Sequence, residues 1–360
     1  MNIVMISTDR NLFDSESNVS ARFKKYGTLF SELHVVVLNV GNVEPYSLLE
    51  NVHVHPINAN SKLGYIFMSL KKFSFKNADV VSSQDAFLTG VIGSRLAKKL
   101  QTTFHVQIHT DLFSRAYSTF SFKNKIEVVV SKFILKKADA IRVVSRRIKQ
   151  SLLKSLPKIS EEIITVLPIQ VSKQEVTETL TFPYTYIVTT IARLEKEKQV
   201  EKTITAFALA TRGRTDVGLL IIGTGSLQKK LETLVEQLGI ETQVQFLGSV
   251  ANVNNVLAVS DVYIQTSAYE GYGMALAEAA LHTLPIVTTD VGVVGEVLID
   301  GGSCLVASGN TKDVAAKLTH VLDNDIEGKS LGNRAYENVL EMVGGEEVYL
   351  REYKSSLSKS

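Results

Sequence analysis

The chain has 360 residues, enough for two domains with full cores, and 45% of them are hydrophobic against 21% that are charged. This composition is typical of a soluble globular protein and excludes a disordered one. No apolar run approaches the roughly 20 residues that a membrane-spanning helix needs. The N-terminus lacks the features of a signal peptide, and Cys304 as the single cysteine excludes an internal disulfide. We therefore expect a cytoplasmic protein.

The net charge of +2 is unevenly distributed along the chain. Residues 1–180 carry a net charge of +9 and the remainder −7, and residues 62–158 hold 19 basic residues against 5 acidic ones. This asymmetry favours a partner with phosphates, such as an anionic membrane surface. Nucleic acid is disfavoured because no recognised nucleic-acid motif accompanies the basic residues. Aromatic residues are interleaved with the basic ones: Tyr65, Phe67, Phe73 and Phe75 near Lys71, Lys72 and Lys76, and Phe113, Tyr117, Phe120 and Phe122 near Arg115, Lys123 and Lys125.

A second interpretation of the same segment stays open. Basic residues often solvate the outer faces of helices, and alternate aromatic residues often fill cores. A location on the inner face of a membrane is therefore one alternative to a purely cytoplasmic one.

The first half of the chain alternates strands and helices, which predicts a Rossmann-like sheet whose ligands lie beyond the carboxyl ends of its strands. His109 ends one of these strands, although a single histidine there is often structural. His105 and Asp111 are weaker candidates for a site. The expected strands are 3–6, 34–39, 79–83, 103–109, 138–145 and 163–171, and the expected helices are 19–33, 87–99, 126–137 and 146–156.

A second unit of the same kind follows a polar linker at 173–183. Its first apolar strand begins at Tyr186 and leads into a loop with Arg193 and Lys198. Arginine can bind a diphosphate through two donors while lysine adds a mobile charge, although a charged loop is commonly just solvated. Further strands are expected at 218–222, before a glycine turn, and at 244–249, 261–267 and 285–290, with helices at 226–238, 311–322, 332–342 and 346–357.

The most informative stretch runs from residue 267 to residue 296. Gly271 and Gly273 flank Tyr272 before an Ala/Leu-rich run, which predicts a sharp turn into a helix whose first N–H groups can meet an anion. Glu270 precedes the turn, and Glu278 lies eight residues later among apolar residues, where a carboxylate without a partner would be costly.

Sugar hydroxyls suit such a carboxylate and a phosphate suits the helix start, so a nucleotide sugar would satisfy both. Glycine and glutamate near a helix start are also common without any ligand, because acidic residues favour the positive end of a helix dipole. A short apolar strand follows the helix, and Gly292 and Gly295 then open another loop, which is the helix-to-strand alternation of a parallel α/β sheet.

This stretch resembles the E-x7-E motif of glycosyltransferase family 4, whose members are retaining enzymes with the GT-B fold. Tyr272 stands for the usual Phe, Thr283 for a Gly before the proline strand and Val293 for the second Gly of a pair. The first loop, at 14–18, has no Gly-Gly pair.

A second motif of the family, G-R-L-x-x-x-K-G, matches at Arg193 and Lys198. Ala192 and Gln199 replace its flanking glycines, and both cations remain. The resemblance covers nearly the whole chain and is most specific between Ile187 and Leu305.

The resemblance implies an α/β protein of GT-B fold, with two Rossmann-like doubly wound domains facing a cleft. The implied domains are an acceptor-side domain at 1–172, a linker at 173–184, a nucleotide-sugar-binding domain at 185–343, and a helix at 344–360 that crosses back to the first domain. The implied activity is retaining transfer of a hexose-type sugar from a UDP- or GDP-sugar to a glycan or lipid-linked acceptor, in cell-surface polysaccharide synthesis.

The resemblance also assigns roles to particular residues. His109 and Glu270 take the catalytic positions, with no metal and no cofactor other than the donor substrate. The donor-binding residues are Arg193, Lys198, Gly271, Tyr272, Gly273, Met274 and Glu278. Two other classes stay open: a sugar-nucleotide epimerase or phosphorylase on the same fold, and a non-catalytic partner that binds a sugar nucleotide or a membrane.

Overall fold

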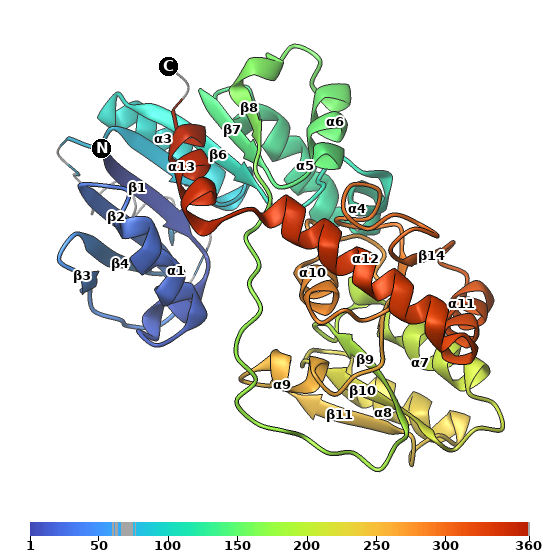
Figure 1. The fold of residues 1–360 in the computed structure, drawn as a ribbon. Helices are drawn as coiled ribbons and strands as arrows, with labels where there is room; N and C mark the ends of the chain where they lie inside the picture. Colours follow the sequence, from blue (N-terminus) through green and yellow to red (C-terminus); the bar gives the residue numbers. More distant parts are fainter. Residues whose placement is uncertain (60, 62–63, 66–74, 76, 359–360) are drawn as a thin grey trace. The chain divides into compact units, whose positions relative to one another are not determined.

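The computed structural model describes residues 1–59, 61, 64–65, 75 and 77–358. The chain divides into two compact units (Figure 1): unit 1 is Met1–Pro168 with Gly345–Ser360, and unit 2 is Ile169–Gly344. Each unit has its own sheet and its own hydrophobic core. Lys62, residues 66–74 and residue 76, which carry part of the basic and aromatic segment, lie outside the described residues.

The sheet of unit 1 is parallel apart from β3, which pairs antiparallel with β4 at its edge. The strand order in the described part of unit 1 is β3-β4-β2-β1-β5-β6-β7-β8. The sequence analysis missed β3 and β4: apolar residues in β4 do alternate with His53 and His55, as in a half-buried strand, but Pro56 within the run weakens that signal. The strands are β1 (Asn2–Ser7), β2 (Glu32–Asn39), β3 (Tyr46–Leu49), β4 (Val52–Asn58), β5 (Val80–Ser83), β6 (Thr103–Ile108), β7 (Ala140–Val143) and β8 (Ile164–Val166).

Serine side chains cap several helices of unit 1 by accepting a backbone N–H bond in the first turn, as Ser17, Ser121 and Ser145 do. One helix prediction was wrong: the helix expected over 19–33 ends at Gly27, where a Cβ atom would lie 2.4 Å from Val52 Cγ2. The helices are η1 (Arg10–Phe13), α1 (Asn18–Gly27), α3 (Leu88–Leu100), α4 (Arg115–Phe120), α5 (Phe122–Leu135), α6 (Arg146–Ser155), η2 (Glu161–Ile163) and α13 (Glu346–Ser356).

The last helix, α13, packs into the core of unit 1, as Figure 1 shows beside the first strands. The rings of Tyr353 and Tyr26 stack with centroids 4.4 Å apart. Arg142 on β7 is 2% exposed, and its guanidinium donates to Gln107 Oε1, the Pro168 carbonyl and Tyr349 Oη at 2.9 to 3.0 Å. The buried charge of unit 1 is therefore held in part by a segment about 200 residues away in the sequence.

Unit 2 contains a fully parallel sheet in the order β11-β10-β9-β12-β13-β14. This is the doubly wound order of a Rossmann fold, and the direction of winding reverses between β9 and β12. Ligands of such sheets bind beyond the carboxyl ends of the strands at that reversal. The strands are β9 (Tyr186–Ile191), β10 (Val217–Ile222), β11 (Val244–Gly248), β12 (Val262–Gln265), β13 (Ile286–Thr289) and β14 (Leu305–Ala307).

The long helix α12 packs against α10, and it begins seven residues before the predicted start at 332. Gly332 lies inside the helix. This position requires glycine because a Cβ atom there would be 2.0 Å from the Thr283 carbonyl oxygen. Among the described residues, no helix has both the length and the apolar character to cross a bilayer. The helices of unit 2 are η3 (Lys196–Lys198), α7 (Val200–Ala210), α8 (Gln228–Leu238), α9 (Val253–Leu257), α10 (Met274–Leu281), α11 (Thr311–Asp323) and α12 (Asp325–Val343).

Candidate functional site

Two predicted site residues meet where β9 and β12 end. Lys198 closes η3 after β9, and Glu270 lies in the loop after β12. The neighbouring strands bring Lys198 Nζ and Glu270 Oε1 to 2.5 Å, with the side chains only 16% and 13% exposed. An ion pair this far removed from water is stronger than a surface pair, and removing one partner would leave the other charge poorly solvated.

Neutral groups on β12 and just after it also hold the Glu270 carboxylate. Ser267 Oγ and Gln265 Nε2 donate to the same Oε1 atom at 2.7 and 3.1 Å, and Tyr263 Oη donates to Gln265 Oε1 at 3.0 Å. Within the described part of the chain no donor meets Glu270 Oε2, so that atom can accept from a ligand. The sequence analysis missed Gln265 and Ser267, although polar residues at the end of an apolar strand were the available signal.

The start of α10 lies directly after Glu270 and is not capped by a side chain. Gly273 takes φ +83° as its N-cap residue, and the first helical bond runs from the Leu276 N–H to the Gly273 carbonyl. The N–H groups at this helix start can therefore bind an anion. Tyr272 is buried, and its hydroxyl lies 3.3 Å from Met342 Sδ of α12. Gly292 passes close by, since a Cβ atom there would lie 2.3 Å from the Tyr272 carbonyl oxygen.

Glu278 lies one turn further along α10 and is mostly buried. Burial raises the pKa of its carboxyl above the usual range. The structure gives it no hydrogen-bond partner among the residues described, and its side chain is partly exposed, so its oxygens are open to solvent or to a ligand. After burial, the charges of Glu270 and Glu278 both raise the pKa of Tyr263, which shows that both carboxylates lie near that hydroxyl.

Arg193 lies at the same edge of the sheet but has a different partner. Its Nη2 atom lies 2.8 Å from Glu197 Oε1, and its side chain is 70% exposed. The loop that carries it packs against the glycine turn after β10, because a Cβ atom at Gly223 would lie 2.0 Å from the Ala192 carbonyl oxygen. Arg193 thus lies in the same loop after β9 as Lys198, and its exposed side chain can exchange Glu197 for a ligand.

Two positions where the family motif has glycine keep a left-handed backbone here. Gln199 has φ +50° and Thr283 has φ +58°. Such angles cost a non-glycine residue about 1–2 kcal/mol. The Gln199 carbonyl accepts from Thr266 Oγ1 at 2.9 Å, which helps to hold this conformation beside Lys198.

The remaining predicted site residue, His109, belongs to unit 1 and follows β6. Burial, followed by the charge of Arg142, lowers its pKa to about 3, so the imidazole is neutral near neutral pH. The same causes lower the pKa of His105 to about 3, and that residue is fully buried with Nδ1 2.9 Å from Ser82 Oγ. Asp111 accepts from the Ser114 N–H at 3.1 Å, and burial raises its pKa.

The structure therefore brings together Lys198, Glu270, the start of α10 and Glu278, with Arg193 at the same edge of unit 2. His109 is in the other unit. Over the described residues, no group of three or more His, Cys, Asp or Glu side chains is arranged to hold a metal ion. The geometry combines a cation and free N–H donors for an anion with carboxylate oxygens for hydroxyl groups.

The match to a family model falls within unit 2. Residues 173–338 match the family model described as Glycosyl transferases group 1. The N-acetyl-alpha-D-glucosaminyl L-malate synthase of Bacillus anthracis is 33% identical over 159 residues, which cover 44% of this chain and 42% of that protein. The poly(ribitol-phosphate) alpha-N-acetylglucosaminyltransferase of Staphylococcus aureus is 26% identical over 164 residues, 45% of this chain and 33% of that protein. The chain thus spans less than half the length of these two relatives.

Solved structures resemble the whole chain. A sucrose-phosphate synthase from Thermosynechococcus elongatus has a TM-score of 0.82 at 16% identity and covers 98% of both chains. Anabaena HepE in complex with UDP has a TM-score of 0.76 at 17% identity, with 99% of both chains covered. At these identities the likeness shows the fold, which confirms the prediction of two Rossmann-like domains of the GT-B type.

Proposed function

We propose that this protein is a retaining glycosyltransferase that moves a hexose-type sugar from a nucleotide diphosphate donor to a glycan or lipid-linked acceptor. The observation that carries the proposal is the Lys198–Glu270 pair at the switch point of unit 2, beside an uncapped helix start and a mostly buried carboxylate. The family match over residues 173–338 supports it, as do relatives whose names describe N-acetylglucosaminyl transfer.

The donor's diphosphate meets the positive groups of the site. Lys198 uses one N–H on Glu270 and has two more for phosphate oxygens, while the N–H groups from Gly271 to Met274 approach the phosphate or the sugar. Arg193, already at the edge of the site, moves toward the diphosphate and can bind it through two donors. These groups offset the charge of the leaving diphosphate, so the proposed route requires no metal ion.

The two carboxylates bind hydroxyl groups of the donor. Glu278 accepts from the ribose hydroxyls, which supply the hydrogen bonds that its burial demands. Glu270 is fixed through Oε1 by three donors and presents Oε2 to the transferred sugar. Because its orientation is set before the donor binds, this carboxylate loses little freedom on binding.

The proposed reaction is a displacement on one face of the sugar. The bond between the anomeric carbon and the diphosphate oxygen breaks, and a bond from that carbon to the acceptor oxygen forms on the same face. The acceptor's proton passes to the departing diphosphate. Neutral His109 donates a hydrogen bond to a sugar hydroxyl and does not act as a charged acid, because its pKa is about 3. That the two units face a cleft in which His109 meets the sugar stays a prediction.

A thermal-shift panel of nucleotide sugars followed by calorimetry tests the donor site. UDP-N-acetylglucosamine comes first, because the relatives' names specify N-acetylglucosamine and a solved neighbour binds UDP. A matching donor should raise the melting temperature by mass action, and Glu278→Ala should remove the shift with little change in the unliganded protein. Unchanged donor affinity in Glu278→Ala would contradict the assignment.

A transfer assay with labelled donor and a panel of lipid-linked and glycan acceptors separates the alternatives. Transfer to an acceptor supports the proposal, donor turnover without acceptor would favour an epimerase or phosphorylase, and binding without turnover would favour a non-catalytic partner. Activity should survive EDTA. Strong loss in EDTA with recovery on adding Mn²⁺ would contradict the metal-independent route.

A further inference from the structure

Helix α5 of unit 1 presents a line of large apolar side chains to solvent. These residues, at spacings of four, three and four, fall on one side of the helix. They are Phe122 at 78% exposed, Ile126 at 49%, Val129 at 55% and Phe133 at 63%. We refer to these four residues as the α5 stripe.

The opposite side of α5 accounts for the packing of the helix in unit 1. Asn124, Ser131, Ile134 and Leu135 are buried there, and Asn124 donates to the Tyr117 carbonyl of α4 at 3.1 Å. Because the buried side already anchors the helix, the α5 stripe is not needed to hold it in place. Exposed phenylalanine at both ends of such a line is unusual, because removing large apolar groups from water lowers the free energy.

Lysines border the α5 stripe on both sides. Residues 122–137 contain five lysines and a single acid, Glu127, whose carboxylate is already engaged by Lys123 at 3.6 Å and by the Tyr117 hydroxyl. The five lysines are Lys123, Lys125, Lys132, Lys136 and Lys137. An apolar line between cationic borders is the pattern of helices that lie in the surface of an anionic bilayer.

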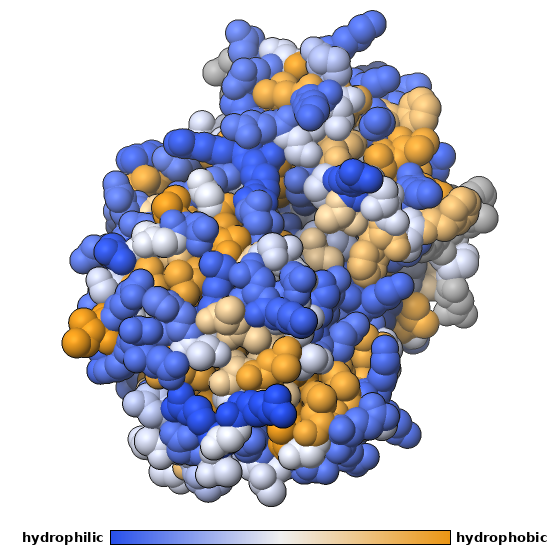
Figure 2. Space-filling model, turned by 90° about the vertical axis from the view of Figure 1, so that its right-hand side faces the viewer, coloured by the Kyte–Doolittle hydropathy of each residue, from blue (hydrophilic) through white to orange (hydrophobic). Residues whose placement is uncertain are grey.

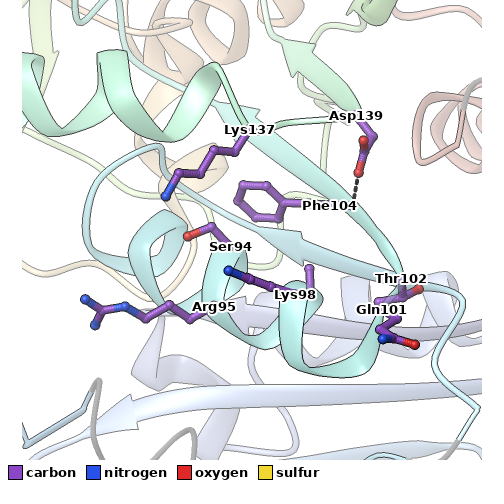
Figure 3. Close-up of a pocket in the computed structure, with 9 residues that line it drawn as sticks. Ser94, Arg95, Lys98, Gln101, Thr102, Phe104, Lys137 and Asp139 are labelled. Atoms are coloured by element: carbon purple, nitrogen blue, oxygen red, sulfur yellow. Dashed lines mark hydrogen bonds between the residues drawn. The ribbon is translucent and has the colours of Figure 1, made fainter.

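A basic pocket opens at the end of the same helix. It encloses about 630 Å³ between α3, β6 and the residues after α5. Figure 3 shows the cationic ends of Arg95, Lys98 and Lys137 on one side of it. Asp139, the acid among its lining residues, lies on the other side of the view and accepts from the Phe104 N–H at 2.8 Å.

Lys137, a lining residue of the pocket, lies in the turn after α5, four residues beyond Phe133, so the pocket lies near the end of the stripe. A lipid whose phosphate entered the pocket would therefore have its acyl chains near the apolar line. Phosphate is the group that clustered Lys and Arg side chains favour.

We propose that the α5 stripe and the adjoining basic pocket form a membrane-docking face that binds anionic phospholipid. The four apolar side chains enter the boundary between headgroups and acyl chains. The bordering lysines attract the surface charge, and Arg95, Lys98 and Lys137 bind a headgroup phosphate. This face is distinct from the donor site and does not depend on the proposed transfer reaction.

Charge complementarity selects a bilayer over a second protein as the occupant. Figure 2 shows apolar side chains gathered in several patches among hydrophilic ones on one face of the molecule, so an exposed apolar group alone is not diagnostic. Ile326 on α12, for example, is 87% exposed but stands between Asp325 and Glu327. The α5 stripe differs because its apolar residues are aligned and its neighbours carry one sign of charge.

Co-sedimentation of the full chain with vesicles tests the proposal. The protein should bind vesicles made of equal parts phosphatidylcholine and phosphatidylglycerol, should bind phosphatidylcholine alone far more weakly, and should lose binding as salt is raised. The double variant Phe122→Ser/Phe133→Ser should lower the partition coefficient by about tenfold or more, because two large apolar groups no longer enter the bilayer. Ile326→Ser is the matched control and should bind as the wild type does.

Charge variants separate the lysine border from the stripe. Lys132→Glu/Lys136→Glu should lower binding by about tenfold at low salt. The matched control Lys229→Glu/Lys230→Glu, on exposed positions of α8, should have a much smaller effect. Arg95→Ala/Lys98→Ala tests the pocket and should weaken binding to anionic vesicles. All variants should keep the wild-type melting temperature, because each replaced side chain is on the surface.

Three results would overturn the proposal. The first is equal binding to neutral and anionic vesicles, or none to either. The second is a wild-type dimer in light scattering that Phe122→Ser/Phe133→Ser converts to monomer, which would assign the face to a second copy of the chain. The third is wild-type vesicle binding by Arg95→Ala/Lys98→Ala while that variant loses the binding of inorganic phosphate in calorimetry, which would assign the pocket to a free anion.

Discussion

The two units share a winding order but use their buried polar residues differently. In unit 1 the guanidinium of Arg142 is satisfied by Gln107, by two backbone carbonyls and by Tyr349 of α13. In unit 2 the Lys198–Glu270 pair is followed along the chain by the start of α10 and by Glu278, for which the described residues provide no side-chain cap and no hydrogen-bond partner. A similar winding order therefore supports a buried structural network in unit 1 and a site that can accept a ligand in unit 2.

Replacing Lys198 gives the sharpest test of that contrast. Lys198→Met keeps the bulk but leaves Glu270 with neutral donors only, so kcat/KM for transfer should fall by about a hundredfold to a thousandfold. Lys196→Met, in the same short helix, is the matched control and should stay within a few-fold of wild type. Comparable losses in both variants would mean that η3 merely supplies positive charge.

The matching change in unit 1 should act on stability instead. Arg142→Met leaves several buried acceptors without a donor and should lower the free energy of unfolding by about 3 kcal/mol. Tyr349→Phe removes one of these bonds and should cost about 1 kcal/mol. Denaturant unfolding measures both, and donor affinity per folded molecule should be unchanged. A large change in that affinity would contradict the assignment of Arg142 to stability alone.

Unlike Arg142, Glu278 should affect both donor binding and the pH dependence of stability. Glu278→Gln should weaken donor binding by about tenfold, because a hydroxyl bonds a carboxylate more strongly than an amide. Since burial raises the folded-state pKa, the unliganded wild type should gain stability as the pH falls through that value toward the unfolded one. Glu278→Gln should lack this gain in denaturant unfolding measured across pH. An unchanged pH profile would place the carboxyl in water.

His109 should affect stability only on the acid side. Its pKa is lowered from 6.5 to about 3, so the folded protein binds a proton less readily than the unfolded one between these values. Stability contributed by neutral His109 is therefore present above about pH 6.5 and is lost as the pH falls, at up to about 1.4 kcal/mol per pH unit. His109→Gln should reduce the slope of the free energy of unfolding against pH by the contribution of one proton. His105 should contribute equally in the wild type and in the variant.

The smallest expected effect concerns backbone strain beside the site. Gln199→Gly should stabilise the protein by about 0.5–1 kcal/mol, because glycine accepts φ +50° without the usual steric cost. The Thr266 bond to the residue 199 carbonyl should persist, so transfer activity should stay within a few-fold of wild type. A stabilised but inactive variant would show that the strained backbone contributes to catalysis.

The sequence predicted the features that follow from position relative to a strand. Lys198 and Glu270 each follow an apolar strand, and parallel strands that are neighbours place such residues together. The partners of Arg193 and Glu270 could not be predicted, because they depend on side-chain geometry. Arg193 pairs with Glu197, and Glu270 accepts from Gln265 and Ser267. The sequence analysis assigned sugar hydroxyl groups to Glu278, and among the described residues the structure gives it no partner from the chain itself.

Other features were beyond sequence reasoning for equally physical reasons. The β3–β4 hairpin was not predicted, because Pro56 lies within the run of residues that forms β4. Gly332 suggested a helix start, although it is a contact point inside α12. The α5 stripe could not be separated from core residues by letters alone, since the choice of buried side depends on what packs against the helix.

The docking of α13 has a consequence for synthesis of the chain on the ribosome. Residues 1–168 emerge first but lack Tyr349 and Tyr353, which supply the Arg142 contact and the stacking on Tyr26. Unit 1 therefore cannot reach its final packing until residues 345–357 have been translated, after all of unit 2. A nascent chain should hold a loosely packed first unit for most of its elongation, and proteolysis of stalled chains of increasing length would reveal when protection begins.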